Sequence, residues 1–315
     1  MLSGGQTANF TRGPLLTVVS GERRLLSTRY TPLVLLAGLT GIALASADAQ
    51  VPLAPASPSG STATPAYEGW YRNADGSYSL SFGYYNRNTA EVLNVPIGPD
   101  NSISPGPADQ GQPSYLYPRR HWGVFAVRVP ADFQGKVTWT LKDRGQTFAI
   151  SGSLREEWQI DALEGEAGTN NTPPVLTVDG GPEARGPGGS SIDRTAKVGQ
   201  PLTISVVAKD DAATGVVAAT PASSATVTTA AAQAARSGAA PVTLTWFTHQ
   251  GPATVTFGTP TARLAPTGGT SSTTATFSKP GDYILRVRAN DSDVTAAGHS
   301  QCCWTNAFVR VRVTP

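Results

Sequence analysis

The sequence predicts an all-β protein made of two β-sandwich domains, which follow an N-terminal leader and a tether. Glycine and proline account for 33 and 25 of the 315 residues, and charged residues for only 15%. This composition favours turn-rich β-structure over long surface helices, which carry more charge. Short segments in which apolar and polar residues alternate with period two recur along the chain after residue 66, as expected for half-buried strands.

The N-terminal segment is typical of a secretory signal peptide. Three arginines precede an apolar run over residues 33–45, and a small-residue cleavage motif ends at Ala49. The run is shorter than the about 20 residues that span a bilayer. We therefore expect residues 1–49 to be a signal peptide with an N-terminal extension, and residues 50–65, rich in Pro, Ser and Ala, to be a disordered tether. An uncleaved membrane anchor is the alternative.

The charge distribution argues against a nucleic-acid partner. The formal net charge of +2 belongs to the leader, because the chain from Gln50 onward contains as many acidic as basic residues. A neutral surface lacks the basic footprint that a phosphate backbone requires. The chain from Gln50 onward also contains no second apolar stretch long enough to span a membrane.

The first domain is expected over residues 66–168. Apolar residues at 78, 80, 82 and 84 alternate with Ser or Gly, which predicts a strand after the turn at Asn73–Gly76. Strands are further expected at Glu91–Val95, Trp122–Val129, Lys136–Leu141, Gln146–Ile150 and Glu157–Leu163. About seven short strands in roughly 100 residues are typical of a sandwich or a barrel.

The second domain is expected over residues 169–315, where four motifs follow one another: Asn171-Thr-Pro-Pro-Val, Val198-Gly-Gln-Pro-Leu-Thr-Ile, Leu244-Thr-Trp and Phe277-Ser-Lys-Pro-Gly-Asp-Tyr. In this order they resemble bacterial PKD-like and other immunoglobulin-like extracellular modules. The resemblance implies a β-sandwich in which Trp246 packs in the core and the Pro-Gly-x-Tyr turn starts a strand. The first domain looks like an uncharacterised secreted bacterial β-domain, through its blocks GWYRNADGSYSLSFGYYNRN and PRRHWGVFAVRVP, and this implies no activity.

Two stretches of the second domain depart from the pattern. Residues 179–195 are rich in Gly and Pro, and residues 212–240 are rich in Ala. Because neither stretch carries enough large apolar side chains to pack, both are expected to be surface loops.

Catalytic patterns are not found in the sequence. It contains no zinc-protease motif, no nucleophile elbow, no Walker loop and no dinucleotide fingerprint. The three histidines, His121, His249 and His299, are scattered over both domains, which does not support a zinc site or a catalytic triad. We therefore expect a protein that is not an enzyme.

Acidic residues follow two predicted strands of the second domain: Asp210 and Asp211 after one, Asp291 and Asp293 after another. In an immunoglobulin-like sandwich such strand ends can meet at one pole, where carboxylate oxygens suit Ca²⁺. The alternative is that Asp and Asn only initiate turns there.

Cys302 and Cys303 are the two cysteines of the chain, and they are adjacent. In an oxidising compartment they favour a vicinal disulfide, with intermolecular disulfides or buried thiols as alternatives.

The last two predicted strands carry four arginines on one face. Arg286 and Arg288 alternate with apolar residues, and so do Arg310 and Arg312. If the strands pair antiparallel, as the resemblance implies, the arginines form a cluster that suits the carboxylates of an anionic glycan or of an acidic protein. The alternatives are a solvated face and docking to the first domain, which has 12 acidic and 9 basic residues between positions 67 and 168.

Aromatic and basic residues concentrate in the segment 115–122 of the first domain. This segment is a candidate platform for stacking sugar rings or for contacting a protein. Its candidate residues are Tyr115, Tyr117, Arg119, Arg120, His121 and Trp122.

The sequence therefore predicts a secreted, periplasmic or cell-surface module that is not catalytic and that recognises an envelope protein or a polysaccharide. Two alternatives are an accessory protein of a glycan-acting hydrolase, or such a hydrolase itself, and a redox element that uses the two cysteines.

Overall fold

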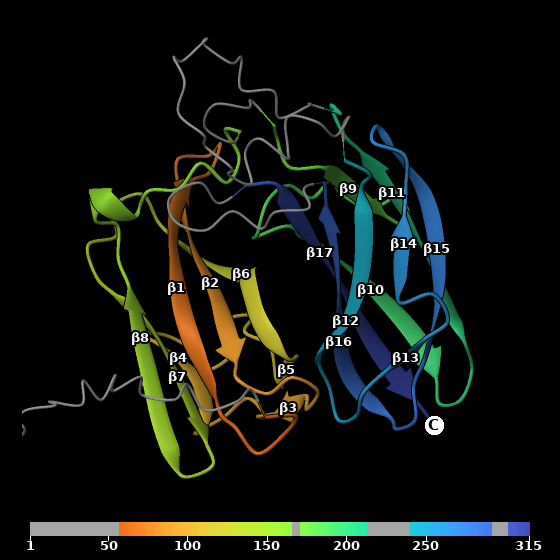
Figure 1. Cartoon of the computed structure of the whole chain (residues 1–315), viewed down its shortest axis with the longest axis horizontal. Helices are drawn as coiled ribbons and strands as arrows, with labels where there is room; N and C mark the ends of the chain where they lie inside the picture. Colours follow the sequence, from red (N-terminus) through yellow and green to blue (C-terminus); the bar gives the residue numbers. More distant parts are fainter. Residues whose placement is uncertain (1–56, 166–170, 213–239, 292–301) are drawn as a thin grey trace, which may run out of the picture. The chain divides into compact units, whose positions relative to one another are not determined.

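The structure is a computed structural model that describes residues 57–165, 171–212, 240–291 and 302–315 (Figure 1). These residues all belong to one compact unit, Ala54–Pro315. The chain is essentially all-β, as the sequence predicted, and the three-residue 3₁₀ turn η1 is the helical element of the described residues. The expected signal peptide, residues 50–56 of the tether and nearly all of the loop 212–240 lie outside the described residues.

The first half of the unit is a sandwich of two three-stranded sheets with a small two-stranded sheet beside them. The strand orders are β1-β2-β6, β4-β7-β8 and β3-β5. The strands are β1 (Ala63–Arg72), β2 (Tyr78–Asn86), β3 (Leu93–Asn94), β4 (Asn101–Ser104), β5 (Tyr115–Leu116), β6 (Arg119–Val129), β7 (Val137–Asp143) and β8 (Gln146–Gly152).

Aromatic rings fill the core of the first sandwich. Phe82 of β2 and Phe125 of β6 stack with ring centroids 5.5 Å apart, and Trp139 of β7 meets both edge-on, at 6.4 and 5.1 Å. The buried Trp139 satisfies its indole N–H by donating to the Asn101 side chain at 2.9 Å. The strand expected at residues 78–84 is confirmed, and Leu80, Phe82 and Tyr84 are buried. The strand is not half-buried as expected, because Ser79 and Ser81 on its other face are buried too.

Two segments of the first half differ from the expectation. β1 begins at Ala63, so residues 63–65 form a strand where the sequence suggested a tether. Residues 157–163 were expected to form a strand, but η1 (Glu156–Trp158) begins this segment. Its apolar residues Ile160 and Ala162 then pack with Tyr71 in a small separate cluster. Alternating apolar residues can therefore also occur in an irregular segment that covers the edge of a sheet.

The second half is a sandwich of a five-stranded and a four-stranded sheet, with strand orders β10-β17-β16-β12-β14 and β13-β15-β11-β9. The strands are β9 (Val175–Val178), β10 (Ser190–Lys197), β11 (Leu202–Lys209), β12 (Thr243–Gln250), β13 (Thr256–Phe257), β14 (Thr261–Arg263), β15 (Gly268–Thr276), β16 (Gly281–Asn290) and β17 (Trp304–Thr314). Trp246 of β12 lies in the apolar core between the sheets, and β16 begins at Gly281 of the Pro-Gly-x-Tyr turn, as the resemblance implied.

The expected loop 179–195 is in part a strand. Residues 190–197 form β10, which pairs in parallel with β17. Small and polar residues suffice here because β10 is an edge strand whose stability comes from the backbone ladder, not from large buried side chains. The preceding Gly-Pro-Gly residues also contact the interior of the protein, since the Gly186 N–H donates to the buried hydroxyl of Thr305 at 3.0 Å.

Candidate functional site

The two sandwiches meet through a polar and aromatic contact, which we call the joint. It consists of Tyr84, Tyr117, His121 and Gly123 on the first sandwich and of Phe247, His249, Arg286, Trp304 and Asn306 on the second. These side chains come from β2, β6 and the β5–β6 turn on one side, and from β12, β16 and β17 on the other.

Asn306 makes several hydrogen bonds at the joint, one of them to Gly123 of the first sandwich. Its side-chain N–H groups donate to the carbonyls of Gly123 at 2.7 Å and Pro187 at 2.9 Å, and its Oδ1 accepts from Arg286 at 3.1 Å. The neighbouring Trp304 indole donates to the same Gly123 carbonyl at 3.3 Å. A side chain at position 123 would collide with the Trp304 ring, so glycine is required for this close approach.

A second set of hydrogen bonds joins β12 to the residues that flank β5 on both sides. The Ser114 N–H donates to the His249 carbonyl at 2.8 Å, and the Thr248 N–H donates to the Tyr117 hydroxyl at 3.0 Å. The His249 imidazole lies 2.8 Å from the Gly111 carbonyl. Since a carbonyl only accepts, the histidine Nε2 carries the proton.

Arg286 is the largest charged side chain that the joint buries, with 1% of its surface exposed. Its guanidinium lies over the Phe247 ring, 4.4 Å from the centroid, and Arg288 lies 5.8 Å from the same centroid. Among the described residues no ion pair includes Arg286. Burial lowers the pKa of Arg286 to about 9, so its charge is held at a cost by the aromatic ring and Asn306.

Both described histidines lie in the joint and are neutral. Burial, followed by the positive charge of Arg286, lowers the pKa of His249 to about 3. Burial also lowers the pKa of His121 to about 3, and Arg286 and Arg288 act in the same direction. The His121 ring stacks on Tyr84 with the ring centroids 5.0 Å apart, which covers one face of the imidazole.

The aromatic segment 115–122 is not an exposed platform. Tyr115 is buried, and the other residues except Arg119 are half-buried. Arg120 is held by the buried Glu68 at 2.5 Å and stacks on Trp122 at 3.8 Å. The segment contributes to the core and the joint, because the second sandwich covers the face that its aromatic residues occupy.

The four arginines lie on one face of antiparallel strands, as expected, but they do not form one cluster. The register opposes Arg286 to Phe308 and Arg310 to Ile284, so the two pairs follow one another along the ladder, and what separates them is their cover. Arg286 and Arg288 enter the joint. Arg310 is exposed and pairs with Asp193 at 2.8 Å, and the exposed Arg312 pairs with Asp282 at 3.2 Å.

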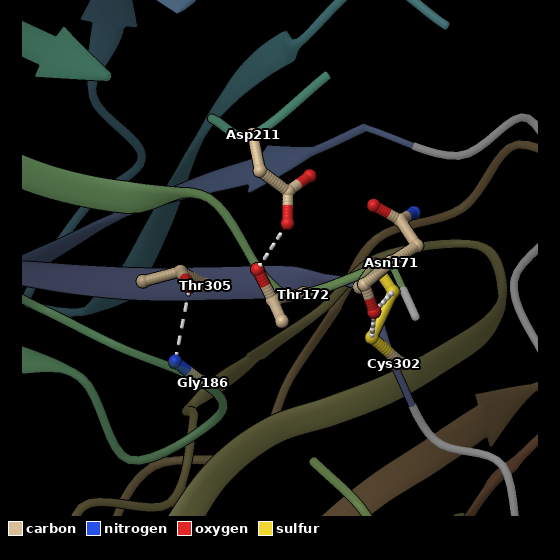
Figure 2. The surroundings of a disulfide bond; sticks show 7 residues. Asn171, Thr172, Gly186, Asp211, Cys302 and Thr305 are labelled. Carbon is tan, nitrogen blue, oxygen red and sulfur yellow. Dashed lines mark hydrogen bonds between the residues drawn. A yellow bond between two sulfur atoms is a disulfide. The ribbon is translucent and has the colours of Figure 1, made fainter. Parts of the chain in front are cut away.

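The two cysteines are joined in a vicinal disulfide that is buried where β17 begins (Figure 2). Cys302 and Cys303 are 2% and 1% exposed. The carbonyl oxygen of Asn171 lies 3.0 and 3.2 Å from the two sulfur atoms. Because disulfide sulfurs carry no proton, these are sulfur–oxygen contacts, and they hold the start of the second sandwich against β17.

We expect this disulfide to resist reduction while the protein is folded, because its burial excludes thiolate reductants. Treatment with a mild phosphine reductant and iodoacetamide should leave both cysteines unmodified in buffer, and should label both in 6 M guanidinium chloride. Mass spectrometry of the intact chain measures the labelling. Labelling at equal rates in the two conditions would contradict the burial and would favour a redox role.

The predicted acidic residues are only partly brought together. Asp210 and Asp211 follow β11 and Asp291 follows β16, whereas Asp293 lies outside the described residues. Asp211 accepts a hydrogen bond from Thr172 at 2.7 Å (Figure 2). Within the described ranges no group of three or more His, Cys, Asp and Glu side chains is arranged to hold a metal ion.

Sequence reasoning missed Phe247, His249 and Asn306 as members of the joint. Phe247 and His249 lie on β12, and Asn306 lies on β17. The alternation of apolar and polar residues along a strand does not distinguish a face covered by another sandwich from a face covered by water. The available signal was the aromatic residue Phe247 beside Trp246, since two adjacent large apolar residues on one strand require cover on both faces.

Comparisons with known proteins give no family. No model of a protein family matches the sequence, and no curated protein matches it. Among solved structures, domains 4 and 5 of the S-layer protein SbsC are 10% identical over 69% of this chain and 78% of that chain, with a TM-score of 0.24. The D00-D0 domain of intimin is 13% identical over 81% of this chain and 100% of that chain, with a TM-score of 0.25.

The D0-D1 domain of intimin is 15% identical over 80% of this chain and 97% of that chain, with a TM-score of 0.23. In the part of the chain that the structure describes, no helix has the length and apolar character needed to cross a bilayer. At identities and TM-scores this low, we draw nothing about function from these likenesses; the chain is similar to these surface-protein domains only at that level.

Proposed function

We propose that this chain is a non-catalytic structural and binding module of the cell envelope or extracellular space, secreted through the N-terminal leader, whose two sandwiches act as one unit. The observation that carries the proposal is the joint. It buries the charge of Arg286, the neutral His249 and the Asn306 hydrogen bonds, and it half-buries the neutral His121. Such a costly contact is of use where the relative position of two sandwiches must be held.

The surface left for a partner lies outside the joint, around Trp158. Trp158 is 42% exposed, and its ring lies 5.3 Å from that of Tyr67. Trp70 lies near the C-terminal end of β1, and its indole N–H donates to the Arg155 carbonyl at 2.7 Å. An exposed indole backed by further rings suits both the apolar face of a sugar and a protein contact. The proposed partner is accordingly an envelope polysaccharide or an envelope protein.

Two observations favour this proposal over the alternatives. Asp210 and Asp291 converge, but Asp291 is 4% exposed, so a glycan does not reach the Asp291 carboxyl group. The disulfide of Cys302 and Cys303 is likewise buried, whereas a redox element exchanges with thiolates at its surface.

The proposal is tested by a pull-down from the native envelope fraction, with the chain from Gln50 onward as bait. The wild type should retain a specific protein or polysaccharide, and Trp158→Ser should lose most of it. The matched control is Arg310→Ser with Arg312→Ser, which alters an exposed face without touching Trp158, and should retain the partner. Equal retention by wild type and Trp158→Ser would reject this surface. Release of reducing ends from the retained polysaccharide would reject the non-catalytic role.

A further inference from the structure

Two aspartates from different strands meet at one end of the second sandwich. Asp210 follows the last residue of β11, and Asp291 follows the last residue of β16. Their carboxyl groups are close enough to influence each other's pKa. Asp291 is 4% exposed, so the pair is removed from bulk water on at least one side.

Three of the four carboxyl oxygens of this pair have no hydrogen-bond partner. Both carboxyl oxygens of Asp291 and Oδ1 of Asp210 are buried without a hydrogen-bond donor. The remaining oxygen of Asp210 accepts from the Ala212 N–H at 3.1 Å. Buried carboxylates ordinarily accept several hydrogen bonds, so three unmet oxygens at one point indicate that a positively charged group belongs there.

The described side chains do not supply that charge. No Lys or Arg of the described residues forms an ion pair with Asp210 or Asp291. Burial, and then the neighbouring Asp210 carboxyl, raise the pKa of Asp291, and burial also raises the pKa of Asp210. Two such carboxyls are neutralised either by a shared proton or by a cation.

We propose that Asp210 and Asp291 bind one Ca²⁺ ion at this end of the second sandwich. The donors are all hard oxygens, which suit Ca²⁺ and do not suit Zn²⁺ or copper. The Asn171 side chain lies beside the Asp291 carboxyl and lowers its pKa, against the larger effect of burial. Two carboxylates leave further positions to water and carbonyl oxygens, and predict the weak affinity of extracellular calcium modules, a Kd of about 10⁻⁴ to 10⁻³ M.

The ion would connect segments that are distant in sequence. The Asp291 N–H lies 3.4 Å from the Cys303 carbonyl, and Asn171 lies against the disulfide (Figure 2). Calcium would therefore link the ends of β11 and β16 to the start of β17 and of the second sandwich. This inference does not depend on the partner proposed above.

The experiment compares thermal unfolding of the chelator-treated chain from Gln50 onward in 5 mM CaCl₂ and in EGTA. For a Kd near 0.5 mM we expect calcium to raise the Tm by about 3 °C. The Asp291→Asn variant keeps the shape of the side chain and removes its charge, so it should fold and lose the shift. Asp282→Asn changes an exposed aspartate of the same strand and should keep the full shift.

Terbium luminescence provides a second readout that does not depend on stability. Trp304 lies opposite Asn290 in the β16–β17 ladder, next to the site, and should sensitise bound Tb³⁺. Millimolar CaCl₂ should then quench the emission in the wild type and in Asp282→Asn, while Asp291→Asn should show little emission. The absence of both a calcium-dependent Tm shift and displaceable Tb³⁺ would overturn the proposal and leave a shared proton as the neutralising group. An equal Tm shift in Asp291→Asn would also overturn it.

Discussion

Replacing Asn306 by alanine is expected to lower the free energy of unfolding by about 3 kcal/mol. The change removes two donors from the carbonyls of Gly123 and Pro187, and it removes the acceptor of the buried Arg286 guanidinium. Each buried group left unsatisfied costs about 1 to 3 kcal/mol, with charged groups at the upper end. Urea unfolding of the oxidised chain from Gln50 onward at pH 7 measures the loss.

Two further variants show whether the loss comes from the joint. Asn94→Ala changes an exposed asparagine of β3 and should alter the stability by less than about 0.5 kcal/mol. Arg286→Met, combined with Asn306→Ala, removes the charge together with its acceptor. The double variant should therefore be less destabilised than the sum of the two single changes. A loss below about 1 kcal/mol for Asn306→Ala, or strict additivity, would show that the joint does not depend on this contact.

Acidification from pH 7 to pH 4 is expected to destabilise the folded unit through His249 and His121. Both have folded pKa values of about 3, below the unfolded value of about 6.5. Between these values the unfolded chain binds protons that the folded chain does not. The stability that the neutral histidines contribute is thus fully present above pH 6.5 and is lost as the pH falls. The buried His249 alone contributes a slope of about 1.4 kcal/mol per pH unit.

The variant His249→Gln isolates this contribution from that of the carboxylates. A glutamine amide can donate to the Gly111 carbonyl as the imidazole does, but it does not titrate. Between pH 6 and pH 4, the free energy of unfolding should decrease less steeply for His249→Gln than for the wild type. The difference between the two slopes should correspond to about one proton. Parallel curves for the two proteins would mean that His249 is protonated in the folded state, which contradicts its burial beside Arg286.

The strands show how far sequence reasoning reaches. The alternation at 78–84 and in the two arginine strands identified β2, β16 and β17, together with the face on which each side chain lies. The segment 157–163 and the edge strand β10 were misjudged. The first has strand-like residues but forms only an isolated bridge, from Gln159 to Trp70 of β1, whereas the second has few apolar residues but a full backbone partner in β17. Pairing partners are a property of the fold and do not show in local composition.

The candidate site likewise has features that the sequence predicted and features that only the tertiary structure showed. Adjacent cysteines and acidic strand ends are local features, so the sequence alone pointed to the disulfide and to the acidic pole. The roles of the arginines were decided only by the tertiary structure. Arg286 and Arg310 lie on one face and look alike in the sequence, yet the first sandwich covers one and water covers the other. By itself the sequence determined the all-β fold class and the face of each alternating strand. Only the packing of one sandwich on the other decided which of those faces is buried, because periodicity specifies direction and burial depends on what lies opposite.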